Sequence, residues 1–335
     1  MTNFDITVVR ISNVNAGRLA GLLENRSLRR FQSGIKLDAV DDKTMIELKQ
    51  HEFEKIRNLL VSVCGIVLND DQDYLVETRL LEMANEIGVS TFDELHSRIS
   101  VDQSLLTRVV DLMTTNETLW FRDDSCWITL KEVIIPYLIG KLDNGYSKIR
   151  VWSAASSTGQ ESYSLLILIK ELLEIQGKKA YFDRFSILGT DISKEVIFLA
   201  KRGIYDPFTI SRGMNKQRLA KYFTKERKNY KITDEIKDRV EFRYFNLMDS
   251  FTTLGKFDLV LCRNVAIYFS GAFKTKLFEK ISRVLFPDGF LMLGATESLV
   301  GIANNYVNQS HGNGLYYKLK VADGRGAKNS FNYRQ

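Results

Sequence analysis

The feature that most constrains the fold is a strand-like run that leads through a turn of small residues into a helix. Residues 149–155 form a short apolar run that ends in small side chains, as in a buried parallel strand. Ser156-Ser-Thr-Gly-Gln-Glu161 follows, and apolar residues from Leu165 to Leu173 then recur along one side of a helix. Ligands of doubly wound sheets bind beyond the carboxyl ends of such strands, so this turn is the expected ligand site.

The same alternation of strand and helix continues along the chain and predicts an α/β domain. Further strands are expected at 185–191, 240–245, 257–262, 290–293 and 315–319, with helices at 196–202 and at 273–285. Such alternation implies a mostly parallel sheet that is covered on both faces.

The residues before this domain have a different pattern. Residues 51–115 show helical periodicity, with apolar groups at 53–63, 74–84 and 92–99, which predicts a small all-helical domain. We interpret residues 1–50 as an extension of unknown role, containing a short strand at 4–8 and a short helix around 19–23. Residues 321–335 are polar and contain glycine, so we expect a disordered tail there.

Composition narrows the class of protein. The 335-residue chain has 44% hydrophobic and 26% charged residues, the profile of a soluble globular protein. It has no run of about 18 apolar residues, and its first residues lack the basic-then-apolar pattern of a signal peptide. We therefore expect a cytoplasmic protein without membrane insertion.

Cysteine and histidine usage disfavours disulfides and metal sites. Cys64, Cys126 and Cys262 are far apart and odd in number, which favours reduced thiols. The three histidines are equally scattered and do not have the spacing of metal ligands. We expect neither a structural zinc nor a catalytic metal.

The net charge of +6 leaves two interpretations of the basic residues open. They concentrate between Arg212 and Arg243, where Tyr222, Phe223 and Tyr230 are interleaved. This stretch could bind phosphates and stack on bases. A solvated basic face on a subdomain is the commoner cause, so we expect no nucleic-acid partner.

The ligand turn favours S-adenosylmethionine over a dinucleotide. The GxGxxG pattern that a pyrophosphate needs is absent, and S-adenosylmethionine has no phosphate. Glu161 could accept the amino group of the methionine part. Asp191 ends the second strand, where an acid binds the ribose hydroxyls of adenosine ligands. The alternative for Asp191 is that it caps the helix that begins near Lys194.

Four segments together resemble the chemotaxis protein methyltransferases, the CheR family. They are Thr114-Thr-Asn-Glu-Thr-Leu-Trp-Phe-Arg122, Val151-Trp-Ser-Ala-Ala-Ser-Ser-Thr-Gly159, Cys262-Arg-Asn-Val-Ala-Ile-Tyr-Phe269 and Pro287-Asp-Gly-Phe-Leu-Met-Leu-Gly-Ala-Thr-Glu-Ser298. The likeness runs from His51 to Leu319. It implies a helical N-terminal domain at 51–115 and a Rossmann-like, S-adenosylmethionine-dependent methyltransferase domain at 116–320. It also implies a small antiparallel β-subdomain inserted at about 205–239 of this sequence.

The resemblance also implies an activity and a set of site residues. Substrates of the family are glutamate side chains on the helical cytoplasmic part of receptors, and the products are glutamyl methyl esters and S-adenosylhomocysteine. Arg122 and Tyr268 resemble the pair beside the reacting carboxylate; each taken alone has a plainer interpretation, Arg122 as a surface ion pair and Tyr268 as core. The residues expected to contact the cofactor are Asn116, Thr118, Arg122, Glu161, Asp191, Asn246, Leu247, Arg263 and Asn264.

The sequence departs from the family pattern in three places. Gln160 and Ser162 flank the retained Glu161, where the family usually has glutamate and proline. Residues 70–79 are mostly acidic, although the family often has several arginines there. Residues 222–231 lack the glycine-containing loop of members that tether to a receptor's C-terminal peptide, so we expect no such tethering. We also expect a monomer. The alternatives are a non-catalytic adaptor and a methyltransferase that acts on another substrate, such as RNA or a small molecule.

Overall fold

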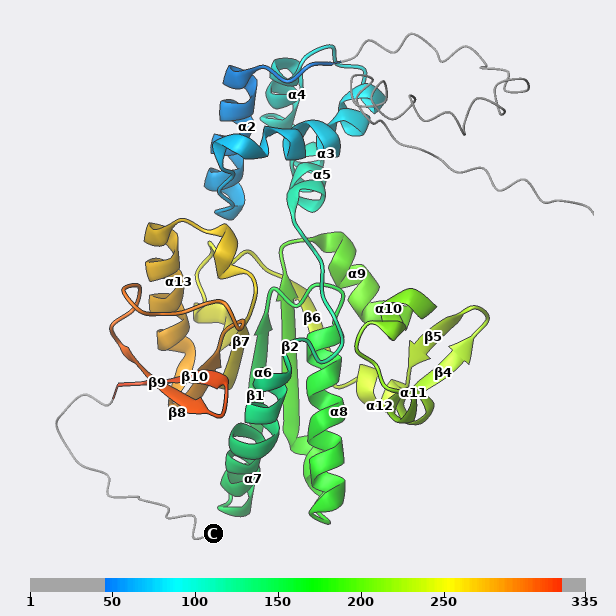
Figure 1. Cartoon of the computed structure of the whole chain (residues 1–335), viewed down its shortest axis with the longest axis vertical. Coiled ribbons are helices and arrows are strands. Elements are labelled where there is room, and N and C mark those ends of the chain that lie inside the picture. Colours follow the sequence, from blue (N-terminus) through cyan, green and yellow to red (C-terminus); the bar gives the residue numbers. More distant parts are fainter. Residues whose placement is uncertain (1–45, 321–335) are drawn as a thin grey trace, which may run out of the picture. The chain divides into compact units, whose positions relative to one another are not determined.

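The computed structural model describes residues 46–320, and its first part is a small helical domain. The buried residues of this part form a core of their own that includes Phe53, Leu80 and Phe92. Its elements, blue to cyan in Figure 1, are α2 (Gln50–Cys64), η1 (Asp70–Gln72), α3 (Asp73–Glu86), α4 (Phe92–Ile99) and α5 (Gln103–Met113). The strand expected at 4–8, the helix expected around 19–23, residues 1–45 of the extension expected at 1–50, and the tail expected at 321–335 lie outside the described residues.

The second part is built on a seven-stranded sheet with the order β6-β2-β1-β7-β8-β10-β9. Neighbouring strands from β6 to β8 are parallel, and β10 is antiparallel to β8 and β9. The strands are β1 (Ile149–Ala154), β2 (Phe185–Asp191), β6 (Val240–Tyr244), β7 (Phe257–Cys262), β8 (Leu285–Met292), β9 (Tyr306–His311) and β10 (Gly314–Leu319). The strand order reverses at β1, because β2 and β6 extend on one side and β7 lies on the other. The carboxyl ends of β1 and β7 therefore flank the switch point at which ligands bind in such sheets.

Helices cover both faces of this sheet (Figure 1). Val151 of β1 belongs to the core that contains Leu166 of α8, whereas its neighbour Trp152 belongs to the core that contains Phe278 of α13. Alternate residues of a strand point to opposite faces, so one strand supports both layers. The helices and turns of this part are α6 (Asp124–Thr129), the π-helical η2 (Leu130–Ile134), α7 (Ile135–Asp143), α8 (Gln160–Ile175), η3 (Lys179–Arg184), α9 (Lys194–Arg202), η4 (Thr252–Leu254), η5 (Ala266–Tyr268) and α13 (Gly271–Val284).

A small subdomain is inserted between α9 and β6. Its antiparallel sheet has the order β3-β5-β4. Its elements are β3 (Ile204–Tyr205), α10 (Pro207–Ser211), α11 (Lys216–Tyr222), β4 (Phe223–Glu226), β5 (Asn229–Ile232) and α12 (Asp234–Lys237). The inserted antiparallel sheet that the family resemblance implies is thus confirmed.

The insert packs closely against the segment that precedes α6, and the contacts centre on Trp120. The Trp120 N–H donates to the Arg212 carbonyl at 3.1 Å, and the Trp120 ring meets Tyr205 and Phe223 edge-on. Gly213 has φ +105°, and its Cα faces the Trp120 carbonyl so closely that a methyl group would overlap that oxygen. Only glycine fits this position, for both conformational and steric reasons.

Gly213→Ala should therefore lower the free energy of unfolding by about 3 kcal/mol, because it adds both strain and overlap. Urea denaturation followed by circular dichroism measures the loss. Gly140→Ala on α7 is the matched control, since nothing lies within 4 Å of the position of its added methyl group. That control should raise the free energy of unfolding by less than about 1 kcal/mol, because alanine favours a helix more than glycine does. Equal urea midpoints for wild type and Gly213→Ala would contradict the close approach of Gly213 to the Trp120 carbonyl.

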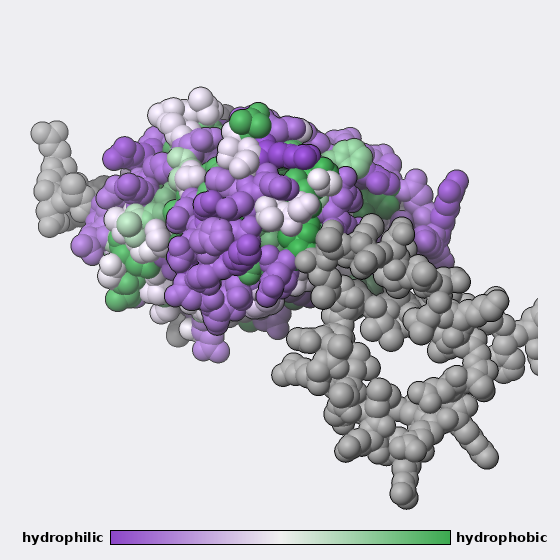
Figure 2. Space-filling model, turned by 90° about the horizontal axis from the view of Figure 1, so that it is seen from above, coloured by the Kyte–Doolittle hydropathy of each residue, from purple (hydrophilic) through white to green (hydrophobic). Residues whose placement is uncertain are grey.

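Most of the predicted elements are confirmed. The all-helical first domain and the mostly parallel sheet are both present, whereas β8 begins at Leu285, earlier than expected, and β9 was not predicted. Within residues 46–320, no helix combines the length and apolar character needed to cross a bilayer. The face in Figure 2 is mostly hydrophilic, with scattered hydrophobic side chains.

Candidate functional site

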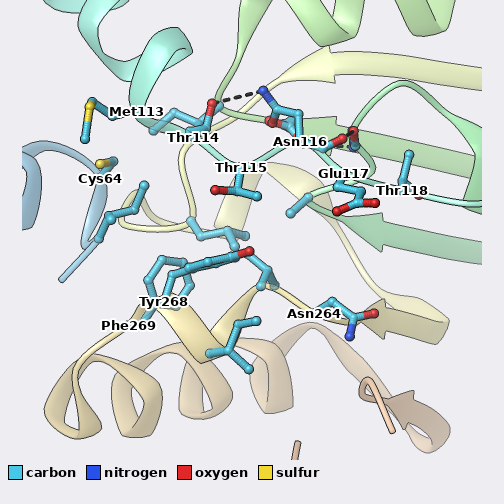
Figure 3. A pocket seen from close by; sticks show the side chains of 18 of the residues that line it. Cys64, Met113, Thr114, Thr115, Asn116, Glu117, Thr118, Asn264, Tyr268 and Phe269 are labelled. Atoms are coloured by element: carbon cyan, nitrogen blue, oxygen red, sulfur yellow. Dashed lines mark hydrogen bonds between the residues drawn. The ribbon is translucent and has the colours of Figure 1, made fainter. Parts of the chain in front are cut away.

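One cavity of about 430 Å³ lies at the carboxyl ends of the parallel strands. Residues just after β1, β2, β6 and β7 line it, together with residues of the helical domain. In Figure 3 the residues from Thr114 to Thr118 lie across the cavity from Asn264 and Tyr268. The side chain of Tyr268 projects into the cavity. The volume falls within the range of about 300–1,000 Å³ that is typical of small-molecule sites.

All ten site residues expected from the sequence line this one cavity. They come from five separate stretches of the chain and converge only in the folded state. They are Asn116, Thr118, Arg122, Glu161, Asp191, Asn246, Leu247, Arg263, Asn264 and Tyr268. Their convergence places the expected residues together; the role of each stays a prediction.

Glu161 and Arg263 form a buried ion pair at the switch point. The Arg263 Nη1 donates to Glu161 Oε2 at 2.8 Å, and Ser153 Oγ donates to Glu161 Oε1 at 2.7 Å. The side chain of Arg263 is 2% exposed and that of Glu161 is 12% exposed. Each carboxylate oxygen retains further accepting capacity, so Glu161 can also receive an ammonium group from the cavity. Arg263 thereby fixes the orientation of the Glu161 carboxylate at the cavity wall.

Arg263 also fixes the backbone of Arg122. Its Nη2 donates to the Arg122 carbonyl at 2.6 Å and to Asp123 Oδ2 at 2.9 Å, while Trp127 Nε1 donates to the same carbonyl at 2.8 Å. Asp123 has φ +68°, a conformation that non-glycine residues rarely adopt. The Arg122 side chain is half-buried at the cavity wall, and its Nη1 donates to the Glu117 carbonyl at 3.2 Å. The guanidinium thus keeps free donors for a ligand.

Asp191 links the ends of β1 and β2. Its Oδ2 accepts the Ser157 N–H at 2.9 Å and its Oδ1 accepts the Ser193 N–H at 3.0 Å. Burial raises the pKa of the Asp191 carboxyl, although these N–H groups oppose the shift by favouring the ionised form. The side chain that caps α9 is Ser193, which accepts the Val196 N–H, so the alternative of Asp191 as the helix cap is wrong.

The loop after β7 carries Asn264 and Tyr268. Asn264 adopts φ +57°, and its N–H donates to the buried Glu297 Oε2 at 2.6 Å. Gly294 donates to the same oxygen at 2.8 Å. The Tyr268 carbonyl accepts the Val67 N–H at 2.9 Å, which joins this loop to the chain leaving α2. Glu297 and Val67 therefore hold the loop from two sides.

The helical domain contributes cavity residues that the sequence did not predict. Gln72, Leu75 and Arg79 all line the cavity. Arg79 Nη1 donates to the Met113 carbonyl at 2.8 Å and its Nη2 to Thr115 Oγ1 at 3.2 Å, so it fixes the connection between the domains. The only sequence signal was that Arg79 is a lone basic residue in an acidic stretch.

The carboxylate acceptors at the cavity wall suit a ligand that carries cationic and hydroxyl groups. Along the sheet edge, the order β7-β1-β2-β6 places Arg263, Glu161, Asp191 and Asn246 in sequence. An ammonium group fits Glu161, a vicinal diol fits Asp191, and a flat ring fits beyond them beside Phe245 and Leu247. This is the order of the methionine, ribose and adenine parts of S-adenosylmethionine.

Comparison with known proteins gives consistent results. The model described as "CheR methyltransferase, SAM binding domain" matches residues 116–313, and the model described as "CheR methyltransferase, all-alpha domain" matches residues 51–114. Chemotaxis protein methyltransferase 1 of Pseudomonas aeruginosa is 41% identical over 80% of this chain and 98% of its own length. Chemotaxis protein methyltransferase Cher2 of Pseudomonas putida is 40% identical over 80% of this chain and 98% of its own length. Chemotaxis protein methyltransferase 1 of Vibrio cholerae is 38% identical over 83% of this chain and its whole length.

Proposed function

The chain belongs to the CheR family of chemotaxis methyltransferases, and from this premise we propose that it esterifies glutamate side chains of a chemotaxis receptor. It is an S-adenosylmethionine-dependent methyltransferase. The observation that supports the proposal best is the convergence of Arg122, Glu161, Asp191 and Tyr268 on one cavity.

S-adenosylmethionine, when bound, supplies an electrophilic methyl group on a sulfonium sulfur. Glu161 binds the amino group of its methionine part, and Asp191 binds the ribose hydroxyls. Asn246 and Leu247 contact the adenine end, and the small residues Ala155 and Ser156 let the backbone approach the ligand. These assignments follow the order of the strand ends along the sheet.

Arg122 and Tyr268 act on the acceptor carboxylate. A glutamate side chain is already ionised near neutral pH, so methyl transfer needs no strong general base. The guanidinium of Arg122 holds one oxygen and the phenol of Tyr268 donates a hydrogen bond to it, which leaves the other oxygen free to attack. In-line placement of that oxygen is the main contribution of the site.

The partner is a protein whose acceptor glutamates lie on helices of the receptor's cytoplasmic part. We propose a monomer that acts without a receptor-tail tether and works in the cytoplasm. The β4–β5 turn, at Arg227 and Lys228, is exposed and carries no glycine. The acidic η1–α3 segment adjoins the cavity through Gln72 and Leu75, so it would face the receptor near the acceptor site.

Transfer of radioactive methyl groups to the cytoplasmic fragment of a receptor tests the proposal. We expect a label that is released by mild base, as glutamyl esters are, and that is lost in Tyr268→Phe. Calorimetry with S-adenosylhomocysteine separates an enzyme from an adaptor, because a non-catalytic adaptor need not bind it. A base-stable label would contradict glutamate esterification, and absence of binding would contradict the methyltransferase site.

A further inference from the structure

A lysine outside the cavity holds the turn that follows β6. Lys280 lies on α13, and its Nζ donates to the carbonyls of Leu247 at 2.5 Å, Met248 at 3.1 Å and Asp249 at 2.9 Å. A lysine ammonium has three N–H donors and no acceptor, so these three carbonyls use its full bonding capacity. The turn 246–249 is thereby wrapped around a single cation.

Aromatic rings complete the surroundings of this ammonium. The Nζ lies 4.5 Å from the centroid of Phe251 and 5.6 Å from that of Phe273. Partial burial lowers the pKa of Lys280, which the nearby Asp249 carboxylate opposes. A cation this well matched by carbonyls and ring faces is held in one place.

The same turn is held from the other side by the helical domain. Asn246 Nδ2 donates to the Val63 carbonyl near the end of α2 at 2.7 Å, and Asn246 Oδ1 accepts the Met248 N–H at 2.9 Å. Asn246 and Leu247 line the cavity, whereas Lys280 is absent from its walls. The hydrogen bonds of Lys280 therefore reach the cavity through the turn, which is its direct connection to a ligand there.

We propose that Lys280 is a positioning residue that sets the affinity for S-adenosylmethionine by fixing the adenine-side turn 246–249. The inference rests on the proposed function, because it takes Asn246 and Leu247 as cofactor contacts. The adenine end lies away from the transferred methyl group, so the turn makes the same contacts before and during methyl transfer. Such uniform binding changes KM and leaves kcat unaltered.

Lys280→Met tests this inference, since it keeps the aliphatic stem and removes the three donors. We expect KM for S-adenosylmethionine and the dissociation constant of S-adenosylhomocysteine to rise about tenfold, while kcat and KM for the receptor fragment stay within about twofold. Lys276→Met is the matched control, because Lys276 is exposed one turn earlier on the same helix. Lys280→Arg keeps a multidentate cation and should restore most of the affinity.

The outcomes are distinguishable. A purely structural role for Lys280 would lower the folded fraction and hence the apparent kcat, with KM unchanged, and that result overturns the inference. Should Lys280→Met fail to fold, Lys280→Gln, which retains two donors, is measured in its place with the same criterion. Equal affinities in wild type and variant refute the positioning role alone, whereas a wild-type chain that binds no S-adenosylhomocysteine refutes the proposed function too.

Discussion

Replacing Arg122 with alanine should lower kcat/KM for methyl transfer by about a thousandfold, or about 4 kcal/mol of transition-state stabilisation. The reason is that the variant loses the guanidinium that holds the acceptor carboxylate in the proposed mechanism. Charge-assisted bonds in a partly water-excluded cavity are stronger than at the surface. Kinetics at saturating S-adenosylmethionine, with the dissociation constant of S-adenosylhomocysteine measured in parallel, separate lost catalysis from lost cofactor binding.

The structure predicts that Arg122→Ala folds normally. The Arg122 backbone is fixed through its carbonyl by Arg263 and Trp127, and both bonds survive removal of the side chain. Arg243→Ala serves as the control, because Arg243 is an exposed arginine paired with Glu241 on β6. Rates within about threefold of wild type in Arg122→Ala would be incompatible with the assigned role, since one such bond is worth more than this factor.

Glu161→Gln should have two large effects, one on the ligand and one on the fold. Affinity for S-adenosylhomocysteine should fall about a hundredfold, because the amide no longer neutralises the ligand's ammonium group. The free energy of unfolding should also fall by about 2–3 kcal/mol, because the buried Arg263 loses one of its two carboxylate partners. Calorimetry and urea denaturation measure the two effects separately.

A matched pair on the same helix provides the control for Glu161→Gln. Glu171 of α8 forms a bidentate pair with Arg218, with distances of 3.0 and 2.7 Å, but both side chains are about a quarter exposed. Glu171→Gln should cost less than about 1 kcal/mol and leave ligand affinity unchanged. A double-mutant cycle of Glu161→Gln and Arg263→Gln measures the coupling free energy between the two side chains. A coupling near zero would contradict the ion pair between Arg263 and Glu161.

Elements with strong burial patterns were predictable from the sequence. The strands β2 and β7 match the expected ranges because every side chain in them, apart from Ser186, is buried. The strand β9 escaped prediction because only Tyr306 of its six residues is buried, as in an edge strand. No element was assigned to 124–143, where the π-helical η2 adds an extra residue per turn and shifts the helical spacing of apolar residues.

The candidate site was predictable where it lies in continuous motifs and not where it depends on tertiary contacts. Glu161 and Asp191 follow strands, and strand ends of a parallel sheet meet at one edge. The anchoring roles of Glu297 and Arg79 could not be predicted, because their partners Asn264 and Met113 are distant in sequence. The cofactor contact expected for Arg263 stays a prediction, and the structure adds hydrogen bonds from its guanidinium to Glu161, Asp123 and the Arg122 carbonyl.

The contact between Gly213 and Trp120 limits how this enzyme can be re-engineered. The inserted subdomain restrains the backbone of the segment that leads to Arg122, because Trp120 donates to the Arg212 carbonyl and packs against the Gly213 backbone. A chimaera that exchanges the insert alone would place a different loop against the Trp120 carbonyl. We expect that loop to displace Arg122, which follows Trp120 by two residues. We therefore expect an exchanged insert to preserve the fold only when the segment from Asn116 to Arg122 is exchanged with it.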